Sequence, residues 1–188
     1  MSENVTKTEK KEAGMAQMVL TLGVICAVCA LLLGLVNMMT EEVIKKNDII
    51  KKTAAMQEVL AADADAYQPA TYTGDDATVL NVYEVVGKGN VVEVNCAAGS
   101  FSGTLSIMVG VNSDGTVSGV SIVTTAETSG LGSKASDPAF KDQYVGKGGT
   151  LAVDKDGGEI AAISGATITS RAVTAGVNSA LAAVGQLG

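Results

Sequence analysis

The chain of 188 residues carries 13 Lys and Arg, 20 Asp and Glu and no His, for a formal net charge of −7. No nucleic acid partner is expected, because proteins bind phosphate backbones through clustered Lys and Arg, and the few basic residues here form no such stripe. The absence of His excludes Ser-His and Cys-His hydrolase mechanisms and removes the commonest nitrogen ligand of metal ions. The length allows one soluble domain beside a membrane segment.

The N-terminal region combines a polar, charged tail, residues 1–12, with an apolar run, residues 13–40, that contains no charged side chain. As a helix this run reaches about 42 Å, more than the roughly 30 Å hydrocarbon core of a bilayer. It is predicted to be a retained transmembrane anchor, since its exit lacks a small-x-small cleavage site and the run continues beyond Cys29, which disfavours lipoprotein processing there. Lysines flank the run on both sides, so the positive-inside count does not decide its orientation.

The three cysteines do not form a disulfide framework. Cys26 and Cys29 lie within the apolar run, where a CxxC pair more often supplies two small apolar side chains than redox or metal chemistry. Cys96 stands alone in the soluble part and is predicted to be a buried small apolar residue.

The fold class predicted for the remainder is α+β. Residues 41–68 are rich in helix formers and are predicted to be a stalk helix, and residues 69–188 are predicted to form one small mixed α+β domain. Short β-like runs predict four strands, at Val79–Val86, Val91–Ala97, Thr104–Val111 and Val117–Thr124. A hairpin turn is expected at residues 112–115, a glycine-containing loop at 128–134, a short helix near 138–143 and a last amphipathic helix at about 169–184.

The segment Ser164-Gly165-Ala166-Thr167 is the candidate functional motif. It follows a strand-like approach and precedes the last predicted helix, and the N-terminus of a helix binds phosphate through free backbone amides and the positive end of its dipole. Gly165 and Ala166 would let a ligand approach the main chain closely. The alternative interpretation is that Ser164 and Thr167 only cap the helix and close a turn. A P-loop is excluded because the Gly-Lys-Ser/Thr sequence is missing.

These residues resemble the FMN-binding domain found in the G subunit of the Rnf complex and in the C subunit of the sodium-pumping NADH:quinone reductase. The resemblance covers the N-terminal anchor and four segments, residues 108–120, 127–134, 140–144 and 164–174. It implies that a flavin transferase esterifies Thr167 to the phosphate of FMN, beside Ser164, Gly165 and Ala166. It also implies that the Glu-Thr-x-Gly-Leu-Gly loop lies against the flavin, which brings Glu127, Thr128, Leu131 and Gly132 near the ring.

The chain departs from the family pattern at three positions. Thr125 stands where members often have His, and Ser129 stands where they often have Pro, which predicts a softer loop without an imidazole. Ala161 stands where an Asp is common, three residues before Ser164. If that Asp assists recognition by the transferase, Ala161 lowers the efficiency of modification.

The function implied by the resemblance is that of a membrane-anchored electron carrier. Such a subunit would work with the other membrane and peripheral subunits of an Rnf-type complex, which couples ferredoxin oxidation and NAD reduction to sodium or proton movement, and its domain would be extracytoplasmic. A covalent flavin needs no acid or base from the protein, so the lack of His is compatible with this role. Two alternatives remain: a stand-alone tethered flavoprotein that feeds an extracellular acceptor, and a non-redox anchored binding module.

Overall fold

The structure is a computed structural model that describes residues 14–187, so the predicted tail, residues 1–12, lies outside the described residues. The chain divides into two compact units, one up to Asn47 and one from Asp48 onward. A single helix, α1 (Met15–Val59), belongs partly to each unit.

The first part of α1 has the properties of a membrane span. Within the described residues, α1 is the one helix long and apolar enough to cross a bilayer, and none of its most apolar window is buried within the chain. Charged residues begin at Glu41, which pairs with Lys45 one helical turn later at 2.6 Å. The expected anchor therefore lies in a helical, uncharged and exposed segment that ends before Glu41.

The predicted stalk helix, residues 41–68, is wrong at its C-terminal end. The helix ends at Val59, and a 3-10 turn, η1 (Ala64–Ala66), leads into an unpredicted strand, β1 (Tyr67–Ala70). Two tertiary contacts override the helical propensity of this stretch: Tyr67 donates its hydroxyl to the Leu60 carbonyl at 2.7 Å, and β1 pairs with β2. The last turns of α1 belong to the same compact unit as the sheet, so this unit begins earlier than residue 69.

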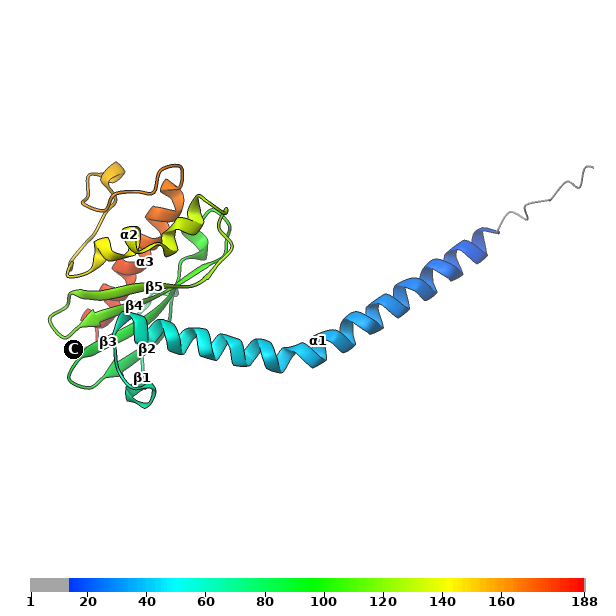
Figure 1. Ribbon diagram of the computed structural model, residues 1–188, viewed down its shortest axis with the longest axis horizontal. Helices are drawn as coiled ribbons and strands as arrows, with labels where there is room; N and C mark the ends of the chain where they lie inside the picture. The colour runs from blue at the N-terminus through cyan, green and yellow to red at the C-terminus, as the bar shows by residue number, and fades with distance from the viewer. Residues whose placement is uncertain (1–13, 188) are drawn as a thin grey trace, which may run out of the picture. The chain divides into compact units, whose positions relative to one another are not determined.

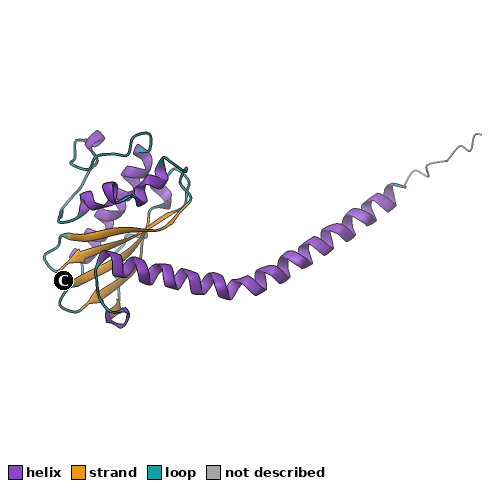
Figure 2. Ribbon diagram, in the orientation of Figure 1, coloured by secondary structure: helices purple, strands orange, loops and turns teal. Residues whose placement is uncertain are grey.

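The second unit is built on one antiparallel sheet, whose five strands follow chain order β1-β2-β3-β4-β5 (Figure 1) and are drawn in orange in Figure 2. The four predicted strands are confirmed, with ends shifted by a few residues: β2 (Val79–Val85), β3 (Gly89–Asn95), β4 (Leu105–Asn112) and β5 (Val117–Thr125). The predicted hairpin turn joins β4 to β5, where Gly115 adopts φ +80° and donates its amide to Asn112. The α+β fold class is thus confirmed.

Both faces of the sheet are covered by helices. Successive residues of a strand point to opposite sides, so one strand contributes to two cores. On β3, Val92 and Val94 pack with α3 (Thr167–Gly185) in the larger core, whereas Val91 packs with the end of α1 in a second, smaller core. The short helix α2 (Pro138–Lys141) and the 3-10 turn η4 (Asp142–Tyr144) adjoin the larger core through Phe140 and Tyr144. The predicted helix near residues 138–143 is therefore present as two short turns.

The end of α1 lies in a notch made by two glycines that face each other across β4 and β5. Gly110 pairs with Gly119 in the sheet register, and a Cβ on Gly119 would lie 3.0 Å from Val59 Cα. A Cβ on Gly110 would penetrate the Val59 carbonyl oxygen. Ser118 also donates its hydroxyl to that oxygen at 2.5 Å. The backbone of α1 thus approaches the sheet as closely as only glycine permits.

A buried ion pair holds the same helix. Glu93 on β3 is 2% exposed, and its carboxylate pairs with Lys52 at 2.8 Å and accepts a hydrogen bond from Asn81 at 2.7 Å. A buried charge needs such partners, because its desolvation is otherwise strongly unfavourable. Further along α1, Glu58 pairs with Lys141 of α2 at 2.6 Å. Two charged residues of the stalk, Lys52 and Glu58, therefore pair with partners in the domain.

We predict that Gly110→Ala lowers the free energy of unfolding of the domain by about 1–3 kcal/mol, because the new methyl group collides with backbone at Val59. Gly185→Ala is the matched control, since a Cβ there meets nothing within 4 Å. Urea denaturation of the detergent-solubilised full chain, followed by circular dichroism, measures both. Equal stability of the two variants would contradict the close approach of α1.

Candidate functional site

The candidate motif forms a tight turn that leads directly into α3. Gly165 has φ +77°, a left-handed conformation that other residues adopt only with strain, and a Cβ there would lie 3.0 Å from the Leu131 side chain. The N-cap residue is Ala166, and no side chain caps the helix. The first amides of α3 therefore lack both an intrahelical and a side-chain partner. The interpretation that Ser164 and Thr167 serve as helix caps is wrong.

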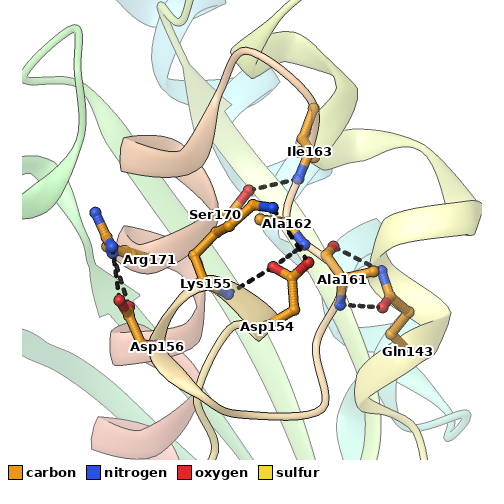
Figure 3. A network of polar contacts seen from close by, with 9 residues as sticks. All are labelled: Gln143, Asp154, Lys155, Asp156, Ala161, Ala162, Ile163, Ser170 and Arg171. Atoms are coloured by element: carbon orange, nitrogen blue, oxygen red, sulfur yellow. Dashed lines mark hydrogen bonds and ion pairs between the residues drawn. The ribbon is translucent and has the colours of Figure 1, made fainter.

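The turn is tied to α3 and to a neighbouring element through its backbone (Figure 3). The buried Ser170 hydroxyl accepts from the Ile163 amide and donates to the Ala166 carbonyl, both at 3.0 Å. The Gln143 side chain accepts from the Ala161 amide at 2.7 Å and donates to its carbonyl at 3.3 Å. Ala161 stands where family members commonly have Asp, and its backbone is held by the Gln143 side chain.

Exposed polar contacts also hold the segment that precedes the turn (Figure 3). Asp154 accepts from the Ala162 amide at 3.1 Å and from the Lys155 amide at 2.8 Å. Arg171 on α3 makes a two-pronged contact with Asp156, at 2.7 and 2.6 Å. The segment before the motif is therefore fixed to the helix that follows it, as a preformed binding turn requires.

The Glu127 carboxylate joins three segments at the back of the site. One oxygen accepts from the Ser102 amide and hydroxyl, both at 2.9 Å, and the other accepts from the Thr169 hydroxyl in the first turn of α3. Burial raises the pKa of Glu127, but the hydrogen bonds from Thr169 and Ser102 outweigh it, so the pKa lies below its usual range. An ionised carboxylate, 8% exposed, therefore stands beside the motif.

The loop after β5 packs closely against this carboxylate. A Cβ on Gly132 would overlap Glu127 and lie 2.8 Å from the Thr169 hydroxyl oxygen, so the position requires glycine. The loop is closed by hydrogen bonds to the Thr128 carbonyl and by the Gly130 amide, which donates to the Ser133 hydroxyl at 2.9 Å. These bonds form with Ser129 in place of the family's Pro. Thr125, in place of its His, accepts from the Glu127 amide at 3.2 Å.

A pocket of about 350 Å³ opens between the motif and this loop. Seven of the eight predicted site residues line it, namely Glu127, Thr128, Leu131, Gly132, Gly165, Ala166 and Thr167. The eighth, Ser164, is exposed and is not part of the lining. The sequence interpretation missed Phe101, Ile168 and Thr169, which complete the walls. Ile168 and Thr169 follow Thr167 directly, whereas Phe101 lies in a loop with no periodicity that could reveal it.

Comparisons with known proteins identify the family of this chain. Residues 100–182, which contain the whole pocket, match the FMN-binding domain family. The chain is 37% identical over 180 residues to the G subunit of the Na⁺-translocating ferredoxin:NAD⁺ oxidoreductase complex of Acetobacterium woodii, an alignment that covers 85% of this chain and 86% of the relative. This chain belongs to the family of Rnf complex G subunits.

Two further relatives show the same extent of similarity. The G subunit of the ion-translocating oxidoreductase complex of Methanosarcina acetivorans is 34% identical, with 88% of this chain and 92% of the relative covered. The G subunit of the proton-translocating ferredoxin:NAD⁺ oxidoreductase complex of Clostridium ljungdahlii is 32% identical, with 85% and 86% covered. The names of these relatives state different ions, so membership of the family does not set the coupling ion.

The cysteines take no part in the site. Cys96 is buried, and burial raises the pKa of its thiol to about 12, so the predicted role as a small core residue is confirmed. Cys26 and Cys29 are free in α1. Across residues 14–187, no group of three or more Cys, Asp and Glu is arranged to hold a metal ion.

We predict that Glu127→Gln lowers the free energy of unfolding by about 2 kcal/mol at pH 7, because it weakens charge-assisted hydrogen bonds from Ser102 and Thr169. The pKa of Glu127 is depressed in the folded state, so its contribution is present above the unfolded value of about 4.3 and is lost as the pH falls through the folded value. The difference from wild type should therefore shrink below about pH 4.

Urea denaturation at several pH values tests this dependence. Glu159→Gln is the control. Glu159 pairs with Lys147 on the surface, where ion pairs contribute little, so this substitution is expected to leave the free energy of unfolding almost unchanged. A Glu127→Gln difference that stays constant from pH 7 to pH 3 would show that the charge contributes nothing.

Proposed function

We propose that this chain is a membrane-anchored flavoprotein subunit that carries FMN through a phosphoester to Thr167 and relays electrons within an Rnf-type complex. The observation that carries the proposal is the position of Thr167. It is the first residue of α3, it lines the pocket, and the helix terminus beside it has no side-chain cap. Membership of the family of Rnf complex G subunits and the match to the FMN-binding domain support the choice of FMN.

The start of α3 is suited to the phosphate end of FMN. The amides of Thr167, Ile168 and Thr169 occupy the first turn, where backbone donors lack intrahelical partners and the helix dipole favours a negative charge. Gly165 and Ala166 place little side chain between a phosphate and these amides. Thr167 is half-buried, and its hydroxyl makes no hydrogen bond within residues 14–187, so it is free to become the ester oxygen.

The rest of the pocket is suited to a planar apolar ring. Leu131, 43% exposed, and Ile168, 49% exposed, present apolar side chains at the pocket, while the Glu127 carboxylate lies behind the loop. The flavin supplies the redox chemistry when bound, and the protein positions the ring and sets its electrostatic surroundings. These residues require no general acid or base, consistent with the absence of His.

The proposed assembly follows from the same family. Other subunits of an Rnf-type complex would donate and accept the electrons, α1 would hold the domain at the bilayer, and a flavin transferase would modify Thr167. We place the domain on the extracytoplasmic side. Ala161 does not weaken the acceptor turn, because the Gln143 side chain holds the backbone at that position. The Asp carboxylate that Ala161 lacks would therefore affect only recognition by the transferase.

We predict that intact protein from its native host carries the mass of FMN minus one water, and that Thr167→Val abolishes this addition. Thr150→Val is the matched control, because Thr150 is exposed and lies outside the pocket. Intact-mass spectrometry of the three proteins tests the site. An unmodified wild type, or a Thr167→Val protein that keeps the added mass, would refute the ester.

The location of the domain can be tested by labelling a new cysteine with a membrane-impermeant maleimide. Lys155→Cys places a thiol on an exposed turn, whereas Cys96 is buried and unreactive. We predict that intact cells label Lys155→Cys, while a Ser2→Cys control in the N-terminal tail is labelled only after permeabilisation. The reverse pattern would place the domain in the cytoplasm.

A further inference from the structure

Phe101 is an exposed aromatic residue that no part of the proposed function uses. Its side chain is 69% exposed, although it is one of only two Phe residues in the chain. The other, Phe140, is buried against Tyr144. Exposed aromatic surface is unfavourable in water, and Phe101 lines the same pocket as Thr167.

The loop that carries Phe101 is held by hydrogen bonds on both sides of it. Before it, the Ser100 hydroxyl donates to the Ala97 carbonyl at 3.0 Å and accepts from the Gly103 amide at 3.1 Å. After it, both the amide and the hydroxyl of Ser102 donate to Glu127. The exposure of Phe101 is therefore built into the loop by contacts that fix its neighbours.

The exposed apolar side chains at the pocket come from three separate segments. Phe101 precedes β4, Leu131 follows β5 and Ile168 begins α3, yet all three line one pocket. Elsewhere in the domain, exposed residues such as Val86 lie outside this lining. The convergence of three apolar side chains beside an anion-binding helix terminus matches a ligand with a planar apolar ring and a phosphate.

We propose that Phe101 contacts the isoalloxazine ring and forms the wall of the pocket that shields this ring from solvent. This inference rests on the proposed binding of FMN and adds a contact residue to it. Aromatic side chains pack favourably against planar π systems in stacked or edge-on arrangements. Glu127 is then a positioning residue, since it holds Phe101 at the pocket through Ser102.

The test compares full-length wild type, Phe101→Ala, Phe101→Leu and the control Val86→Ala, with the folding of each checked by circular dichroism. In the FMN-loaded proteins, we expect iodide to quench flavin fluorescence at least twofold more strongly in Phe101→Ala than in wild type. Phe101→Leu should be intermediate and Val86→Ala unchanged. Loading, measured by intact mass, should be equal in all four proteins.

A second measurement separates this inference from the ester. Riboflavin is titrated into unloaded protein of each variant, and Phe101→Ala should raise the dissociation constant at least fivefold over wild type. A wild type without the added mass refutes the ester at Thr167, whereas the titration still tests Phe101. Equal riboflavin affinity and equal iodide quenching in wild type and Phe101→Ala would overturn the inference.

Discussion

The hydrogen bonds of the Glu127 carboxylate hold together the loop before β4, the loop after β5 and the first turn of α3. Burying a charge is strongly unfavourable unless both oxygens are satisfied, and here Ser102 and Thr169 satisfy them. Because Gly132 packs directly against this carboxylate, the walls of the pocket cannot move independently of it. The shape of the site and the exposure of Phe101 therefore both depend on one ionised side chain.

The same domain is joined closely to its stalk. The end of α1 lies in the notch of Gly110 and Gly119, and Lys52 compensates the buried charge of Glu93. The last turns of α1 are thus part of the core of the second unit and are more than a linker. A firm base of this kind limits how far the pocket can move relative to residues 48–59.

Sequence patterns predicted the strands because their signals are local, whereas most of the pocket was predicted from the resemblance to the FMN-binding domain. Short apolar runs rich in Val mark β3 and β4, and the turn before α3 is recognisable from Gly165 and its small neighbours. The prediction for the end of the stalk was wrong because two tertiary contacts override the helical propensity of this stretch, the hydrogen bond from Tyr67 to the Leu60 carbonyl and the pairing of β1 with β2. Phe101 was missed because a single exposed aromatic in a loop has no period.

The sequence by itself determined the apolar span, the α+β composition and a turn of small residues before a helix as a possible phosphate site, since each depends on residues that are neighbours in the chain. The choice of Thr167 as the candidate acceptor came from the resemblance to the FMN-binding domain. Only the tertiary structure decided that Ser164 lies outside the pocket, that Gln143 holds the backbone of Ala161, and that Glu127 joins its partners. The contacts of Glu127 with Ser102 and Thr169 span 25 and 42 residues. Such contacts form only when the sheet and α3 are assembled, so no local pattern records them.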